Sequence, residues 1–481
     1  MRKFTIAMPQ RIFCLAVLTC LFLWHGPPGA FAVDFKIWGD TDISLGWASH
    51  TGFSNTKRSN DNFDVRQRVR VWTSAQVSEN LKAYMMFRIA TATWGRRGGG
   101  YALDADEVVI RTRFLFLDWQ PESTDLTIRM GIIPVNIPKA AFFSGILDTS
   151  AGGISLAYKF NENFTFNTFW ARPYDDYGND ANAPGNPRGQ NLMDEMDLFF
   201  ASLAFTHRTA DIIPWAMYSH IGKDSSYWNR NVPGGAAGTA GAGTRVWPNG
   251  RADDNGNAWW SGLAVTVKAL DPLVLKADFA YGSEKSDTEG NNYNTSGWQA
   301  FFAADYKLGW GTPGIFGWYA SGSDRDKVEN DQTWGYVPII SPFDIGFNAT
   351  SFGFGDWAGV NPGSQISWHA AGMWGLGAQI KDISFIQDLK HTVRLAYYQG
   401  TNDRDLAGFS YQSRAGYVDL VPMTKGDHAW EVNFNHEYKI YENLILSVDT
   451  GFIDMTRCRE WGPDRNVDTA WEFAANFRYK F

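Results

Sequence analysis

Hydrophobic and polar residues alternate at the C-terminal end of the chain. Over residues 471–481, an extended strand would carry apolar side chains on one face and mostly polar ones on the other. The apolar positions are Trp471, Phe473, Ala475, Phe477, Tyr479 and Phe481. This period of two predicts a β-strand with one oily and one wet face, as expected for a strand that separates lipid from water.

The same period recurs along the chain and predicts eighteen strands. They lie near residues 35–47, 63–77, 81–89, 107–119, 125–133, 152–160, 164–172, 197–206, 212–222, 257–268, 273–282, 296–307, 314–322, 366–380, 389–400, 428–439, 444–453 and 470–481. Short turns alternate with long segments rich in Gly, Asn and Asp. The pattern predicts an all-β fold, a transmembrane antiparallel up-and-down β-barrel with both termini on the periplasmic side. Sixteen strands are the alternative, because residues 323–366 could contain or lack a hairpin.

The composition agrees with a barrel. Hydrophobic residues make up 44% of the chain, and no run of about 18 apolar residues follows the N-terminal segment. Because a barrel strand is only half apolar, its average hydropathy stays low. Aromatic residues reach 16%, with 22 Trp, and such rings are typical of the girdles at the two bilayer interfaces.

Residues 1–32 predict a cleaved secretory signal. They begin with Arg2, Lys3 and Arg11, continue through an apolar stretch and end in a small-x-small motif, Ala30-Phe31-Ala32. The apolar stretch is shorter than the roughly 20 residues that a spanning helix needs. Removing the segment changes the formal charge from -8 to -11 and leaves one domain of 449 residues, 33–481. Its acidity argues against a nucleic-acid partner.

The strand period stops after the fifth strand. Residues 131–153 mix proline, glycine and apolar side chains. A barrel this wide cannot be filled by its own side chains. The apolar residues of this loop would be unusual on a surface that faces water. They are Ile137, Phe142, Phe143, Ile146 and Leu147. We therefore expect the loop to fold into the barrel instead of lying on its surface.

A set of arginines occupies the polar faces of the second to fifth strands. The set comprises Arg66, Arg68, Arg70, Arg88, Arg111, Arg113 and Arg129. The sequence allows two interpretations. The arginines form a basic pore lining, or each one solvates the wall and pairs with a neighbouring acid.

The signal, the strand number, the loop after the fifth strand and the final Phe481 together resemble trimeric outer-membrane porins of Gram-negative bacteria. The layout is most similar to the homotrimeric porins of sulfate-reducing bacteria. This resemblance implies location in the cell outer membrane, a homotrimer, and a water-filled channel for passive diffusion of small hydrophilic solutes and ions. Outward small residues such as Ala157 could meet a neighbouring subunit. Outer-membrane lipid and lipopolysaccharide would surround the barrel.

The resemblance also implies a narrowing formed by the inward loop and the arginine wall. In general porins the loop is acidic and faces a basic wall, and Asp148 would be the matching acid here. The loop is poorer in carboxylates than that pattern. The remaining basic lumen would favour anions.

The sequence is also compatible with functions other than a general porin. A substrate-specific channel for phosphate, sulfate or organic acids is the main alternative. For an enzyme, the scattered histidines and the absence of HExxH, GxSxG and paired cysteines predict no catalytic site, metal site or cofactor. Cys458 is the only thiol after residue 32, so no internal disulfide is possible. An adhesive role would depend on the acidic long loops and ranks third.

Overall fold

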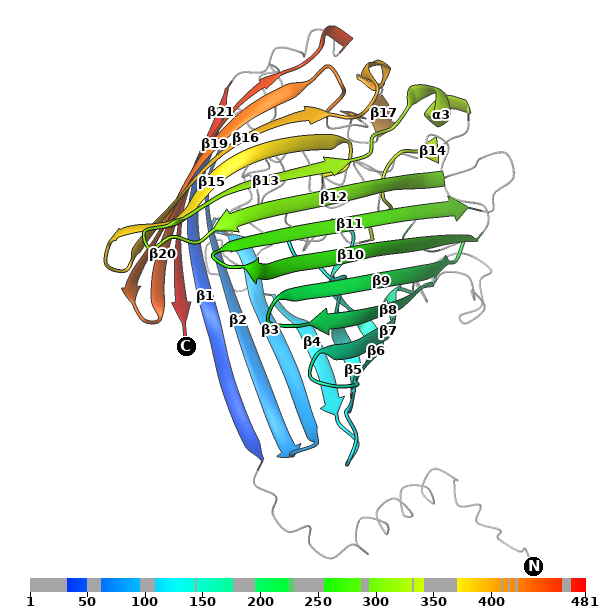
Figure 1. The fold of residues 1–481 in the computed structure, drawn as a ribbon, viewed down its shortest axis with the longest axis vertical. Coiled ribbons are helices and arrows are strands. Elements are labelled where there is room, and N and C mark those ends of the chain that lie inside the picture. The colour runs from blue at the N-terminus through cyan, green and yellow to red at the C-terminus, as the bar shows by residue number, and fades with distance from the viewer. Residues whose placement is uncertain are drawn as a thin grey trace, which may run out of the picture.

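The computed structural model describes residues 33–49, 62–95, 109–142, 145–175, 195–223, 225, 227, 255–286, 294–330, 333–340, 370–407, 410–413, 416–419, 423–460 and 469–481. Within these ranges, eighteen antiparallel strands each pair with the next, and the first pairs with the last (Figure 1). The prediction of a closed eighteen-stranded barrel is confirmed, and the alternative of sixteen strands is wrong. The predicted signal, residues 1–32, lies outside the described residues.

The barrel strands follow the predicted order. They are β1 (Asp34–Ser49), β2 (Asn62–Ser78), β3 (Leu81–Thr93), β4 (Ile110–Trp119), β5 (Leu126–Asn136), β6 (Asp148–Lys159), β7 (Phe164–Tyr174), β8 (Met196–Thr206), β9 (Ala210–Ile221), β10 (Gly256–Leu270), β11 (Leu273–Ser286), β12 (Asn294–Tyr306), β13 (Thr312–Ala320), β15 (Met373–Ile386), β16 (Leu389–Gly400), β19 (His428–Tyr441), β20 (Leu444–Thr456) and β21 (Ala470–Lys480).

The long connections carry further short elements. These are α3 (Arg325–Asn330), β14 (Thr333–Trp334), the 3-10 helix η1 (Arg404–Leu406), β17 (Ser410–Ser413) and β18 (Gly416–Asp419). Among the described residues, no helix is both long enough and apolar enough to cross a membrane.

The seam between β1 and β21 closes the barrel. Their register runs from Asp40 opposite Lys480 to Ser49 opposite Trp471. Beyond it, the backbone of Phe481 exchanges two hydrogen bonds with Gly39, of 2.8 and 3.0 Å. The C-terminus therefore lies beside β1 (Figure 1), and the closed sheet leaves no unpaired edge along this register.

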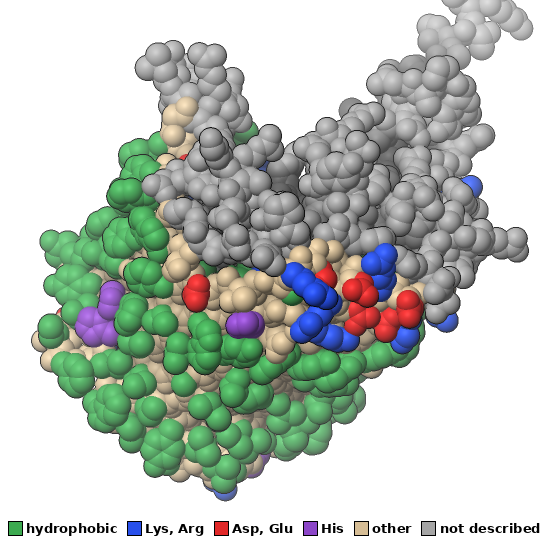
Figure 2. All heavy atoms as spheres, turned by 90° about the horizontal axis from the view of Figure 1, so that it is seen from above, with side chains coloured by type: hydrophobic (Ala, Val, Ile, Leu, Met, Phe, Trp, Pro, Cys, Tyr) green, Lys and Arg blue, Asp and Glu red, His purple; other side chains and the backbone are tan. Residues whose placement is uncertain are grey.

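Alternation gives the wall two different faces. On β12, Trp298 and Phe302 point outward and are 39% and 41% exposed, whereas Gln299 and Asp305 point inward and are each 6% exposed. Hydrophobic side chains cover much of the outer wall in Figure 2. The strands therefore form a barrel that is apolar outside and carries its polar side chains inside, as a lipid environment requires.

Candidate channel constriction

The connection between β5 and β6 folds into the barrel. Ile137, Ile146 and Leu147 are no more than 4% exposed and belong to one buried cluster with inward-facing aromatic residues of β7–β10. Those aromatic residues are Phe169, Phe200, Trp215 and Trp260. The predicted inward loop is confirmed, but its bounds are shorter. Residues 131–136 continue β5 and residues 148–153 begin β6, so the described inward residues are 137–142 and 145–147, together called segment 137–147. Phe143 lies outside the described residues.

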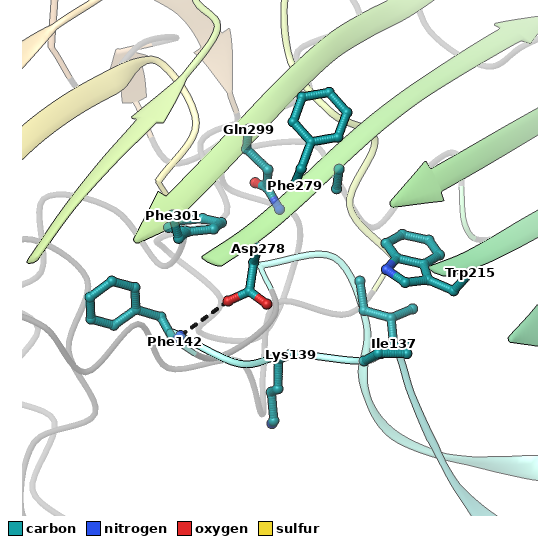
Figure 3. A pocket seen from close by; sticks show the side chains of 10 residues that line it. Ile137, Lys139, Phe142, Trp215, Asp278, Phe279, Gln299 and Phe301 are labelled. Atoms are coloured by element: carbon teal, nitrogen blue, oxygen red, sulfur yellow. Dashed lines mark hydrogen bonds between the residues drawn. The ribbon is translucent and has the colours of Figure 1, made fainter. Parts of the chain in front are cut away.

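The middle of this inward segment is attached to the opposite wall by its backbone. The N–H groups of Ala140, Ala141 and Phe142 all point to the carboxylate of Asp278 on β11, with N···O distances of 2.6, 2.7 and 3.4 Å. Figure 3 shows the bond from Phe142. The ring of Phe142 meets Phe301 edge-on, at 6.1 Å between centroids. The segment therefore crosses from β5 to the β11–β12 wall.

A second segment, residues 333–340, also folds inward. Its first residues form β14, which pairs in parallel with β12. Further along, Trp260 donates its indole N–H to the carbonyl of Pro338 at 2.9 Å, and Tyr174 donates its hydroxyl to the carbonyl of Ile340 at 3.3 Å. Sequence reasoning missed this segment. Its apolar run from Val337 to Ile340 carried the same signal as the first loop, namely apolar side chains in a long connection.

Two of the predicted arginines on β2 are paired with carboxylates of β1. Arg70 makes two hydrogen bonds to Asp40, both of 2.7 Å. Arg68 contacts Asp42 at 2.5 Å, and the same carboxylate accepts a hydrogen bond from Arg478 Nε at 2.6 Å. Asp42 lies between these two guanidinium groups and is only 2% exposed. Arg478, on the polar face of the last strand, was not among the predicted site residues.

Arg129 and Arg66 also have acidic neighbours. Arg129 makes hydrogen bonds of 2.6 and 2.8 Å to Asp118, and its guanidinium lies 4.3 Å from the ring centroid of Phe116. Arg66 approaches Asp64 at 3.9 Å. For these arginines, the interpretation that they pair with neighbouring acids describes the geometry.

Arg88 and Arg111 belong to a row of charged residues that begins on β1. The strand registers place Asp40, Arg70, Arg88 and Arg111 in one row across β1 to β4. Like charges directly opposite one another in a sheet repel. Because the row contains one carboxylate and three guanidinium groups, it carries an excess of positive charge.

Arg113 departs from the alternating pattern. The register between β3 and β4 shifts at Phe87, where a β-bulge adds one residue to β4. The guanidinium of Arg113 lies 5.9 Å from the ring centroid of Phe114. At a bulge, period-two alternation does not determine the face, so the sequence argument for a polar face does not extend to this residue.

Asp148 lies beside the inward segment, and Ala157 lies on the inner face of β6. Asp148 stands at the base of the inward segment and pairs with Lys139 of that segment, at 2.5 Å between Nζ and Oδ2. Residues 137–147 themselves contain no carboxylate. Ala157 is opposite Thr127, on the same face as Arg129, so its expected outward position is wrong.

A hydrogen-bonded network lies on the inner face of β12, β15, β16 and β19. Lys381 and Gln379 of β15 contact Asp305 of β12 at 2.8 and 3.1 Å. Arg394 of β16 continues the network to Gln379, at 3.2 Å, and to Asn435 of β19, at 2.8 Å. Sequence reasoning did not find this network, because its partners come from strands far apart in the chain. Within the described ranges, no three His, Cys, Asp or Glu side chains gather as they would to hold a metal ion.

A closed eighteen-stranded barrel with an apolar exterior, a polar inner face and inward loops has the architecture of an outer-membrane porin. No family model matches the chain, and no curated protein sequence matches it.

Solved structures from Pseudomonas share this fold. OccK9 (OpdG) of Pseudomonas aeruginosa is 11% identical, with 93% of this chain and 98% of that chain covered and a TM-score of 0.52. OpdL of the same organism is 11% identical, with 93% and 99% covered and a TM-score of 0.51. A BenF-like porin from Pseudomonas fluorescens Pf-5 is 11% identical, with 93% and 98% covered and a TM-score of 0.51. At this identity, the likeness concerns the fold.

Proposed function

We propose that this protein is a porin of the bacterial outer membrane, a water-filled barrel through which small hydrophilic solutes and ions diffuse passively. The observation that carries the proposal is the inward segment 137–147, which narrows a barrel too wide to be filled by its wall residues. The apolar outer face suits lipid, and the charged inner face suits water. Transport by this route involves no covalent chemistry and no cofactor.

The proposal includes the cellular location and the oligomeric state that the sequence suggests. The signal in residues 1–32 would direct the chain to the periplasm, and the mature barrel, residues 33–481, would insert into the outer membrane. There it would contact membrane lipid and lipopolysaccharide and assemble as a homotrimer.

The charge of the arginine wall supports a preference for anions. Strands β1 to β5 carry nine basic and five acidic residues, and the excess includes the row from Arg70 to Arg111. A positive wall beside a narrowing raises the local anion concentration and lowers that of cations. Because Asp148 is paired with Lys139, the loop offers little opposing negative field.

A substrate-specific anion channel is the second candidate. The row of three guanidinium groups with one carboxylate would suit phosphate, sulfate or an organic acid, whose charge would relieve the repulsion between Arg88 and Arg111.

Conductance of the purified protein in a planar bilayer tests both candidates. A linear current with weak selectivity would support a general porin, whereas saturating conductance and strong anion preference would support the specific channel. Inserted protein that shows no conductance steps would contradict the porin proposal.

The arginine wall is tested by two variants and a control. Replacing Arg66, Arg68, Arg111 and Arg113 together with Ala should lower anion relative to cation permeability, as measured by the reversal potential in a salt gradient. The double variant Arg88→Gln/Arg111→Gln should do the same, because it removes two of the three positive charges of the row across β1 to β4. Arg459→Gln removes one positive charge from a side chain that is 84% exposed beyond β20, and it should leave selectivity unchanged.

A further inference from the structure

Asp278 is an acidic residue on a largely apolar part of the inner wall, with Lys276 two positions before it on the same face of β11. In register, it lies between Ala264 of β10 and Phe301 of β12, and Ala280 follows it on the same face of β11. A carboxylate in such surroundings is costly unless hydrogen-bond donors satisfy it. Here the donors come from the inward segment, because three consecutive backbone N–H groups, of residues 140 to 142, converge on its two oxygens.

Apolar packing accounts for only part of the contact at this point, where Ala141 and Phe142 pack against the cluster that includes Phe301 and Phe316. A small cavity lies beneath it, lined by Ile137, Lys139, Phe142, Trp215, Asp278 and Phe301 among others (Figure 3). Dispersion contacts are lost wherever a void separates two surfaces. The hydrogen bonds to Asp278 therefore contribute more to the position of this segment than they would in a filled interface.

The two ends of the segment are held differently from its middle. Ile137 and Ile146 are buried among the aromatic residues of β7–β10, whereas residues 140 to 142 reach the wall through Asp278 and the ring of Phe142. Losing the carboxylate would leave the ends attached and would leave the middle held only by the packing of Ala141 and Phe142. The middle is the part that contacts β11 and β12.

We infer that Asp278 is the positioning residue that fixes the width of the constriction, by holding the middle of segment 137–147 against the β11–β12 wall. This inference rests on the proposed porin function. Because the bonds go to backbone N–H groups, the anchor depends on a carboxylate at position 278 and not on the side chains of the segment.

Single-channel conductance and liposome swelling with sugars of increasing size test the inference. Asp278→Ala should raise conductance by roughly twofold and admit larger sugars, because both depend on the narrowest cross-section. Asp278→Asn keeps one acceptor oxygen, so its conductance and its sugar cut-off should lie between those of the wild type and those of Asp278→Ala. Asp211→Ala is the matched control, since Asp211 is an inner-face carboxylate of β9 that pairs with Lys268 at 2.6 Å. Conductance and cut-off that stay at the wild-type values in Asp278→Ala would overturn the inference.

A reversible cross-link distinguishes an effect of Asp278 on the position of the inward segment from an effect on the stability of the whole protein. The double variant Asp278→Cys/Ala141→Cys joins two sites whose groups are in contact, and a disulfide needs Cα atoms within roughly 4.4–6.8 Å. Oxidised protein should conduct like wild type, and the same molecules after reduction should conduct like Asp278→Ala. If no disulfide forms, or if reduction changes nothing, the segment is not held at Asp278. A wild-type protein that does not conduct would instead refute the proposed function.

Discussion

Ile340 donates its backbone N–H to the carbonyl of Ile146 at 3.0 Å, so the two inward segments are bonded to each other as well as to the wall. One segment, residues 137–147, connects β5 to β6, and the other, residues 333–340, belongs to the connection between β13 and β15. The constriction is therefore composite. Moving either segment should change the surroundings of the other, which gives the second segment a testable role.

Gly297→Ala should displace the second segment. A Cβ at this inner-face position of β12 would overlap the backbone of Gly335 and Tyr336, and backbone cannot move aside as a flexible side chain can. Overpacking of this kind costs roughly 1–3 kcal/mol. We expect a higher conductance and faster protease cleavage within residues 333–340. Gly152→Ala is the control, because nothing lies within 4 Å of its Cβ. Wild-type conductance and cleavage in Gly297→Ala would show that the second segment does not limit the channel.

Asp42→Asn should increase anion selectivity and lower stability together. Asp42 accepts hydrogen bonds from Arg68 and Arg478, and the amide would leave two guanidinium groups without their shared negative charge. Breaking a buried ion pair costs roughly 3–5 kcal/mol, and the partial exposure of both arginines places the expected loss of unfolding free energy below that range. Reversal potentials and thermal unfolding in detergent measure the two effects.

The control for this variant lies on the same strand. Asp34 pairs with Lys36 at 3.1 Å, but both side chains are more than half exposed, so Asp34→Asn should change neither quantity appreciably. Unchanged selectivity in Asp42→Asn would place the Arg68–Asp42–Arg478 group away from the ion path.

The strands could be predicted from sequence because alternation and short turns are local signals. The largest error concerns β15, expected at 366–380 and found at Met373–Ile386. Gly372, at the φ of +74° that glycine tolerates, directly precedes the strand, and the alternating residues just before it suggested an earlier start. The partner of each charged residue could not be predicted. The partners of Asp42 come from β2 and from β21, and only the register of the closed barrel brings Arg478 beside β1.

The two inward segments also differ in how far the sequence could predict them. The first was predicted because its apolar residues follow a strand with a clear period, whereas the second lies within a long connection that has no such reference point. The contacts that hold the two inward segments to the wall were not predicted. A carboxylate at position 278 has an ordinary place in an alternating strand, and its role depends on a backbone 137 residues away in sequence.

Gly39→Ala should weaken the seam of the barrel. A Cβ at Gly39 would overlap the ring of Phe481 and the backbone carbonyl of Arg70, and it would disturb the hydrogen bonds between Gly39 and Phe481. We expect a lower unfolding temperature in detergent. Gly309→Ala, in the turn before β13, meets nothing within 4 Å and serves as the control. Equal unfolding temperatures for the two variants would contradict a tight seam at Phe481.

Cys458 should react slowly with thiol reagents in the folded protein. Burial raises the pKa of its thiol to about 11, although a contact with Thr424 at 3.4 Å opposes the shift. The thiolate is the reactive form, so at neutral pH only a minute fraction can react, and the labelling rate should rise about tenfold per pH unit until it levels near the pKa.

Maleimide labelling of the chain from residue 33 onward, over a range of pH, measures this rate. After unfolding in denaturant, the thiol should titrate near its ordinary pKa of roughly 8.5 and label much faster at pH 7. Asp427→Asn should give a labelling rate between those of the folded and the unfolded chain. Asp427 accepts hydrogen bonds from the backbone N–H groups of both Thr424 and Cys458, at 2.6 and 2.7 Å, and weakening them should expose the thiol. Labelling at neutral pH that is equally fast in the folded and unfolded chains would show that residues 424–458 do not shield Cys458.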